Sequence, residues 1–121
     1  MIDEFLERRL GLIRQAIVGL VRRDGPDLTA RQFAVLLTVY LENAAQTVRG
    51  LASLLNVSKP AITRALDRLA EFDLVHRKLD PHDRRSVLVQ RTTAGMEFLN
   101  ELRQIVADRP AQAATASNTT A

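Results

Sequence analysis

The stretch LASLLNVSKPAITRALDRL, residues 51–69, constrains the fold most, because a helical pattern stops inside it and then restarts. Asn56 tolerates the left-handed conformation that ends a helix, and Ser58 is a favoured residue to cap the start of the next one. Pro60 fits the first turn of the second helix because N–H groups there have no intrahelical partner. The sequence therefore predicts two helices joined by a tight turn.

The second of these helices has an apolar and a polar face. At about 100° per residue, one side carries Ile62, Leu66, Leu69 and Phe72. The other side carries Pro60, Thr63, Arg64, Asp67 and Arg68. A short helix, a tight turn and a second helix with a basic outer face predict a helix-turn-helix, a motif that by itself is common in helical proteins.

A β-hairpin is predicted directly after this motif. Residues 74–79 (LVHRKL) and 86–91 (SVLVQR) are rich in β-branched and apolar side chains, and they flank a charged tip at residues 80–85. A helix-turn-helix followed by such a hairpin is the winged arrangement. The expected fold class is therefore mainly α with a small β-hairpin (α+β), a winged helix-turn-helix.

The helix before the motif has a clear start signal. Thr29 and Gln32 form a capping box, and Leu28 with Phe33 occupies the two positions of a hydrophobic staple. This helix should run to about Asn43. The side chains expected to point inward are Phe33, Leu36, Leu37, Tyr40 and Leu41 here, and Leu51, Leu54 and Leu55 in the short helix that follows.

Thr47 and Thr92 are the predicted N-caps of that short helix and of the last helix. The last helix carries Met96, Leu99, Leu102, Ile105 and Val106, and Pro110 should close it. Residues 110–121 have neither charge nor apolar periodicity, which predicts a disordered tail.

Residues 3–23 predict an N-terminal helix. Its apolar side chains alternate steps of four and three, as in a heptad seam: Leu6, Leu10, Ile13, Ile17 and Leu20. About two heptads are too few for an independent coiled coil. The seam therefore packs either on its own domain or on its copy in a second subunit, and the sequence does not choose between these.

Positive charge is concentrated in the middle of the chain. Nine Lys or Arg and five Asp or Glu side chains fall between Arg49 and Arg91, an excess of four, whereas the whole chain carries +3. A polyanionic partner would gain most from that excess. A solvated, arginine-rich surface is the alternative. The aromatic content of 4% disfavours a binder of single-stranded nucleic acid, which stacks bases on aromatic rings.

Several classes of site are excluded or disfavoured. The chain has no cysteine, which excludes disulfides, thiolate metal sites and thiol redox switches. No apolar run approaches the roughly 18 to 20 residues that cross a bilayer, and the N-terminus lacks the order of a signal peptide. We expect a cytoplasmic protein with no membrane partner.

Two elements of the predicted fold, the second helix and the hairpin, can each bind a groove of duplex DNA. The second helix fits the major groove, where base edges are distinguishable. The candidates for contacts with bases and nearby phosphates are Ser58, Lys59, Pro60, Thr63, Arg64 and Arg68. Ser58 is expected to cap the helix rather than to contact phosphate, and Asp67 is expected to orient Arg64 or Arg68.

The hairpin tip supplies a second set of DNA contacts. Arg84 and Arg85 suit a narrow minor groove, where negative potential is concentrated. Asp83, two residues before Arg85, is placed to hold it in position. A solvated charged tip is the alternative, but its position directly after a helix-turn-helix favours the DNA interpretation.

More than half of the chain, from Thr29 to Gly95, resembles the MarR family of winged-helix transcriptional regulators. The segments that carry the resemblance are LTARQFAVLL, LASLLNVSKPAITRALDRLAEFDLVHR and DPHDRRSVLVQRTTAG. The resemblance implies that Arg85 enters the minor groove and that Asp83 orients it. It also implies a dimeric repressor, with a response to a small aromatic or phenolic effector that the sequence does not identify.

Under this resemblance the chain divides by role. Residues 1–24 and 93–109 would be dimerisation helices, residues 25–92 the DNA-binding domain and residues 110–121 the disordered tail. Two departures affect the prediction of a homodimer. Arg91 stands where the family usually has an apolar residue, and the long additional C-terminal helix that commonly completes the dimer interface is missing.

Other functions find less support. His82, Asp83 and Ser86 are neighbours on a hairpin tip and cannot converge around a substrate, so no enzyme and no cofactor are expected. Asp80, His82 and Asp83 would need further ligands to form a closed metal site. The main alternative is a winged helix that contacts another protein, such as a co-regulator, and salt dependence of DNA binding distinguishes the two.

Overall fold

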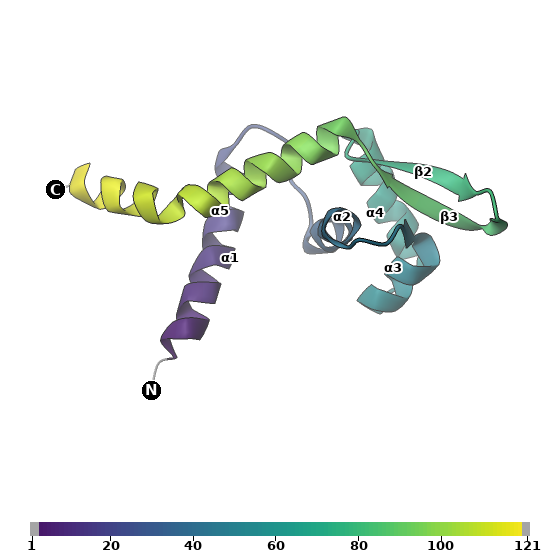
Figure 1. The fold of residues 1–121 in the computed structure, drawn as a ribbon, viewed down its shortest axis with the longest axis horizontal. Helices are drawn as coiled ribbons and strands as arrows, with labels where there is room; N and C mark the ends of the chain where they lie inside the picture. The colour runs from purple at the N-terminus through teal and green to yellow at the C-terminus, as the bar shows by residue number, and fades with distance from the viewer. Residues whose placement is uncertain (1–2, 120–121) are drawn as a thin grey trace. The chain divides into compact units, whose positions relative to one another are not determined.

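The structure, a computed structural model, describes residues 3–119, with side chains as far as Ala107. In chain order the elements are α1 (Glu4–Arg22), α2 (Ala30–Leu41), β1 (Gln46–Thr47), α3 (Val48–Leu55), α4 (Lys59–Glu71), β2 (Val75–Asp80), β3 (Asp83–Arg91) and α5 (Thr93–Thr119) (Figure 1). Residues 28–98 form one compact unit, and α1 with the remainder of α5 belongs to a second. None of the described helices is long and apolar enough to span a membrane.

The unit of residues 28–98 is built around α4. Ile62, Leu66 and Leu69 are fully buried on the face that packs against α2 and α3. The opposite face stays exposed and carries Thr63, Arg64, Asp67 and Arg68. The two predicted faces of this helix are therefore confirmed. Each fully buried leucine or isoleucine contributes about 1.5–3 kcal/mol, so the core beneath α4 fixes which side chains face outward.

The start of α2 is as predicted, but only two of its five predicted inward residues, Leu36 and Tyr40, are buried. The capping box is present: Thr29 Oγ1 accepts from the Gln32 N–H at 3.1 Å, and Gln32 Oε1 accepts from the Thr29 N–H at 2.9 Å. The helix ends at Leu41 rather than near Asn43. Its buried residues are Val35, Leu36, Val39 and Tyr40.

The expected burial of Leu41 and of Leu54 in α3 is wrong, since these side chains are 61% and 62% exposed. Phe33, Leu37 and Leu55 are half-buried. Most of α2 is apolar on every side, so periodicity alone cannot select the inward face. Leu41 follows the buried Tyr40 by one residue, a rotation of about 100° that turns it away from the core.

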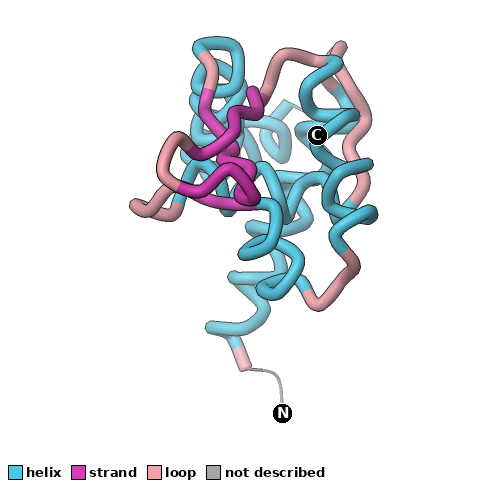
Figure 2. Tube along the Cα trace, turned by 90° about the vertical axis from the view of Figure 1, so that its right-hand side faces the viewer, coloured by secondary structure: helices cyan, strands magenta, loops and turns pink. Residues whose placement is uncertain are grey.

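The wing is larger than the predicted hairpin. β2 and β3 pair antiparallel from Val75 with Arg91 to Asp80 with Asp83, so only Pro81 and His82 are left as the turn. β1 adds to the other edge of β3, which gives a three-stranded sheet in the order β1-β3-β2. The strands are magenta in Figure 2. A strand of two residues is too short for alternation to be visible in the sequence, which is why β1 escapes prediction.

The second unit contains α1 and α5 beyond Phe98. Gln15 donates to the Ile105 carbonyl at 2.8 Å, and Arg23 pairs with Glu101 at 2.8 Å. No residue of α1 is buried. Four residues of the predicted seam, Leu6, Leu10, Ile13 and Ile17, are more than half exposed. The single chain thus leaves most of this seam uncovered.

The last helix continues beyond its predicted end. α5 runs to Thr119, so the prediction that Pro110 closes it is corrected, and residues 110–119 differ from the predicted disordered tail. Residues 120–121 of that tail lie outside the described residues. Proline inside a helix costs about 3 kcal/mol, but the residues that follow Pro110 are rich in alanine, the strongest helix former.

Candidate nucleic-acid interface

Local caps build the turn between α3 and α4. Asn56 ends α3 in the left-handed conformation, with φ 55° and ψ 47°. Ser58 Oγ accepts a hydrogen bond from the Ala61 N–H at 3.2 Å, so Ser58 caps α4 as predicted. Lys59 and Pro60 follow in the exposed first turn. They lie at the positive end of the helix dipole, which favours a phosphate.

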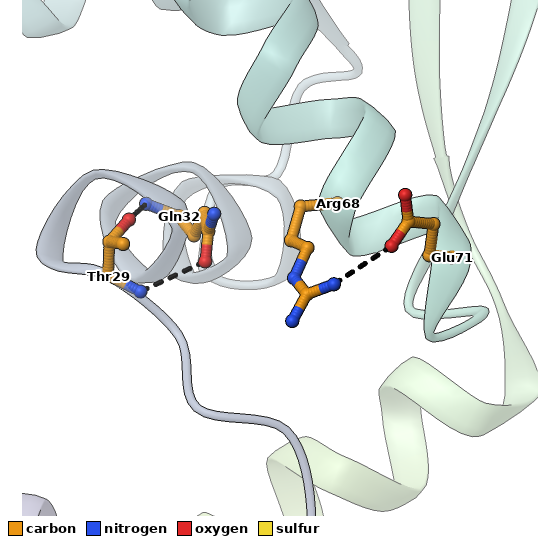
Figure 3. A network of polar contacts seen from close by, with 4 residues as sticks. All are labelled: Thr29, Gln32, Arg68 and Glu71. Carbon is orange, nitrogen blue, oxygen red and sulfur yellow. Dashed lines mark hydrogen bonds and ion pairs between the residues drawn. The ribbon is translucent and has the colours of Figure 1, made fainter.

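The outer face of α4 carries two arginines in different surroundings. Arg68 pairs with Glu71 at 3.0 Å (Figure 3). Its guanidinium carbon lies 4.6 Å from the centre of the Phe72 ring. The Arg64 side chain makes no hydrogen bond or ion pair with any residue that the structure describes. Exposed ion pairs contribute about 0–1 kcal/mol, so Arg68 is restrained weakly and Arg64 not at all.

Asp67 has a partner that the sequence did not predict. Its Oδ1 lies 2.7 Å from an Nη atom of Arg77 on β2, so the expected pairing with Arg64 or Arg68 is wrong. Spacing along one helix cannot reveal a partner that comes from a strand. The ion pair joins the outer face of α4 to the wing, and both elements therefore border the same surface.

Two aspartates organise the tip of the wing. Asp80 Oδ1 accepts from the His82 N–H at 2.8 Å, and Asp83 Oδ1 accepts from the Arg85 N–H at 3.1 Å. The same oxygen lies 3.6 Å from Arg85 Nε, so the predicted contact between Asp83 and Arg85 is present. The Arg85 side chain is 89% exposed, which leaves its guanidinium accessible to a ligand. Arg84 beside it is also exposed.

A groove of about 390 Å³ lies between the start of α2 and α4. Its lining residues are Thr29, Ala30, Arg31, Gln32, Ala61, Arg64 and Ala65. Figure 3 shows the Thr29–Gln32 capping box that shapes one wall. Within the described part of the chain, no group of three His, Asp or Glu side chains is placed to hold a metal ion. The alternative of a metal at Asp80, His82 and Asp83 therefore gains no support.

Sequence reasoning missed the polar contacts at the base of the wing. Arg91, at the end of β3, donates from Nε to the Val39 carbonyl at 2.8 Å and from an Nη atom to the Glu42 carbonyl at 2.7 Å. The Tyr40 hydroxyl donates to the Leu74 carbonyl at 2.6 Å. The only signal in the sequence was an arginine where an apolar residue is usual, and nothing local indicated its partners.

Comparison with known proteins shows a likeness to one protein family. Residues 28–87 match the model of the MarR family. The multiple antibiotic resistance protein MarR of Escherichia coli is 39% identical over 80 residues, which cover 66% of this chain and 55% of that protein. MarR of Salmonella typhimurium is 36% identical over 86 residues, with 71% and 56% covered. The chain thus spans about half the length of the curated relatives that it matches.

Solved structures extend the likeness to almost the whole chain. Wild-type MarR from E. coli in its apo form is 31% identical, with a TM-score of 0.66 over 97% of this chain and 86% of that one. A MarR variant from E. coli in complex with operator DNA is 37% identical, with a TM-score of 0.60 over 75% of this chain and 64% of that one.

Proposed function

The chain belongs to the MarR family, and from that premise we propose that it is a sequence-specific regulator of transcription that binds double-stranded DNA. It acts as a homodimeric repressor, with α4 in the major groove and the wing in the minor groove of each half-site. The complex of E. coli MarR with operator DNA supports duplex DNA as the ligand. A regulator of this kind works beside the chromosome, so we place it in the cytoplasm.

One observation carries the proposal: the ion pair between Asp67 and Arg77 joins the exposed face of α4 to the wing. Arg64 and Arg85, the cations assigned to the two grooves, are both exposed on these linked elements. One duplex can therefore meet both. Phosphate contacts then supply most of the affinity, and base contacts from α4 supply specificity.

The other candidate residues divide by their position on α4 and the wing. Thr63 and Arg68 flank Arg64 on the outer face and are assigned to base edges or adjacent phosphates. Lys59 and Pro60, behind the Ser58 cap, are assigned to the phosphate backbone at the helix N-terminus. Arg84 is assigned to the backbone beside the minor groove that Arg85 enters.

Selection of bound fragments from genomic DNA, followed by footprinting, tests the proposal. A roughly palindromic site is expected, with half-site centres about 34–36 Å or a multiple of that apart. Affinity for the site should fall by about 10³–10⁵ between 50 and 200 mM salt, because a dimer neutralises roughly six to ten phosphates. Light scattering on the same sample should give the mass of two chains.

A winged helix that contacts another protein is the competing function. Duplex binding that does not change with salt, or an absence of binding to any fragment, would favour such a co-regulator and overturn the DNA-binding proposal. A monomeric mass would overturn the homodimer alone, because a single unit of residues 28–98 still carries both DNA-contacting elements.

A further inference from the structure

The end of α2 has one local cap bond, in which the Glu42 N–H donates to the Thr38 carbonyl at 3.1 Å. Its last turn contains no basic residue, and Glu42, which follows, is extended at φ −82° and ψ 142° rather than left-handed. Carbonyls in a last turn lack intrahelical donors and carry the negative end of the helix dipole. α3, by contrast, ends on the left-handed Asn56. The remaining carbonyls at the end of α2 therefore take their donors from water or from another element.

Arg91 supplies those donors from the end of β3. Its Nε and one Nη atom donate to the Val39 and Glu42 carbonyls at 2.8 and 2.7 Å, and its guanidinium carbon lies 5.7 Å from the centre of the Tyr40 ring. A guanidinium presents its donors in a rigid planar fork, so one side chain holds two carbonyls in a fixed arrangement. Lysine, with a single compact charge, cannot reproduce that arrangement.

Arg91 is the last residue of β3, and the other end of this strand forms the tip of the wing. β3 runs from Asp83 to Arg91, and Arg91 pairs with Val75 at the base of β2. Beside it, the Tyr40 hydroxyl bonds to the Leu74 carbonyl, just before β2. Both strands of the wing are therefore fixed to α2 at their base. Because α2 packs against α4, these contacts relate the wing to the DNA-reading helix.

We propose that Arg91 is a positioning residue for DNA binding, which fixes the base of the wing to the end of α2 and so sets where Arg85 stands relative to α4. Two of its three guanidinium nitrogens already donate to backbone carbonyls, so Arg91 is not assigned a DNA contact. The DNA readout rests on the proposed function, whereas the effect on wing geometry does not.

The geometric part is tested without DNA. The chain contains no cysteine, so His82→Cys at the wing tip and Ser53→Cys on α3 can be spin-labelled selectively. Labelled chains are diluted with unlabelled chains, so that the distance measured by electron spin resonance is within one chain. A narrow distance distribution is expected for the labelled parent.

Arg91→Leu and Arg91→Lys should both broaden or shift this distribution, since neither side chain retains the fork. Gln90→Leu, an exposed neighbour on the same strand, is the matched control and should leave the distribution unchanged. Circular dichroism verifies folding, and Arg91→Lys decides the outcome if Arg91→Leu fails to fold. An unchanged distribution in the folded Arg91 variants would overturn the proposal.

The functional part is a double-mutant cycle on the selected DNA site. Arg91→Leu should weaken binding roughly tenfold in the parent and much less in an Arg85→Ala background, because the wing contact is already lost there. Arg91→Lys should not restore affinity. Rescue by lysine, with additive losses for Arg91 and Arg85, would instead identify a phosphate contact and overturn the positioning role. If the parent binds no duplex, the proposed function fails while the label distances still decide the role of Arg91.

Discussion

In the unit of residues 28–98, the backbone groups at helix ends find hydrogen-bond partners in two different ways. At the turn between α3 and α4, Asn56 and Ser58 cap helices that lie within three residues of them. At the wing junction, which we define as Tyr40, Leu74, Arg91, Thr92 and Gly95, the hydrogen bonds of the Tyr40 and Arg91 side chains join residues 34 to 52 apart. The turn therefore depends on local conformation, whereas the junction forms only when the whole unit is folded.

This difference predicts an order of energetic effects. A local cap contributes about 1 kcal/mol, because water satisfies the same groups when the cap is removed. A polar group that is buried at the junction, as in the hydrogen bond from the Tyr40 hydroxyl to the Leu74 carbonyl, has no such substitute and costs about 1–3 kcal/mol when it loses its partner. Changes at the junction should therefore destabilise the protein more than changes at the turn, although the turn lies closer to the proposed DNA surface.

Gly95→Ala should have the largest effect. A Cβ at this position would collide with the Tyr40 hydroxyl and lie 2.5 Å from the Leu74 carbonyl oxygen. The Leu74 backbone cannot move away, and neither can the Tyr40 ring, whose hydroxyl is hydrogen-bonded to two backbone groups. We therefore expect the free energy of unfolding to fall by about 3 kcal/mol. Urea unfolding at a fixed protein concentration measures this.

The control for that substitution is Gly50→Ala in α3. A Cβ on Gly50 would meet only Thr47 Oγ1, at 3.0 Å, and the gain in helix propensity of about 1 kcal/mol offsets this contact. This variant should stay within about 1 kcal/mol of the parent. If Gly95→Ala is no more destabilising than Gly50→Ala, the junction is not as tightly packed as described.

Tyr40→Phe should have the next largest effect, because it removes one hydroxyl and keeps the ring. The hydroxyl donates to the Leu74 carbonyl at 2.6 Å and accepts from the Thr92 N–H at 2.9 Å, so its loss leaves two backbone groups without partners. We expect a loss of about 2 kcal/mol in the same urea assay, with an unchanged slope. If the free energy of unfolding falls by less than the roughly 1 kcal/mol expected for a local cap, the junction is no more sensitive than the turn and the predicted order is contradicted.

Ser58→Ala should have the smallest effect, about 1 kcal/mol, since it removes only the bond to the Ala61 N–H. The variant also separates the two roles considered for Ser58. A serine hydroxyl carries no charge, so neither role changes the salt slope of DNA binding. A cap leaves the affinity of the folded protein for DNA nearly unchanged, whereas a lost phosphate contact weakens binding about uniformly across sequences. Uniformly weaker binding would therefore return Ser58 to the set of phosphate contacts.

The success of the sequence-based predictions also depends on whether a feature is set by nearby or by distant residues. The capping box at Thr29, the caps at Thr47 and Ser58 and the two faces of α4 all depend on neighbours within a few residues, and the structure confirms them. The inward face of α2 and the strand β1 depend on elements distant in the sequence. The inward face of α2 was predicted only in part, with Leu36 and Tyr40 correct, because periodicity does not select a face in a helix that is apolar all round. The strand β1 was missed.

The candidate site shows the same limit. The exposure of Arg64 and the contact between Asp83 and Arg85 follow from local patterns and were predictable. The partner of Asp67 and the role of Arg91 were not, because each pairing joins elements that only the tertiary fold brings together. The arginines that fix the wing cannot be distinguished, in the sequence, from the arginines proposed to contact DNA.

The most direct test of the account measures the affinity of Arg64→Ala and Arg85→Ala for the selected DNA site and for a panel of single-base variants of it. Arg64→Ala should cost about 1–3 kcal/mol and relax discrimination at one major-groove position. Arg85→Ala should weaken binding without altering that position, and both variants should stay folded. If both bind every sequence as tightly and as selectively as the parent, α4 and the wing do not read DNA and the account is contradicted.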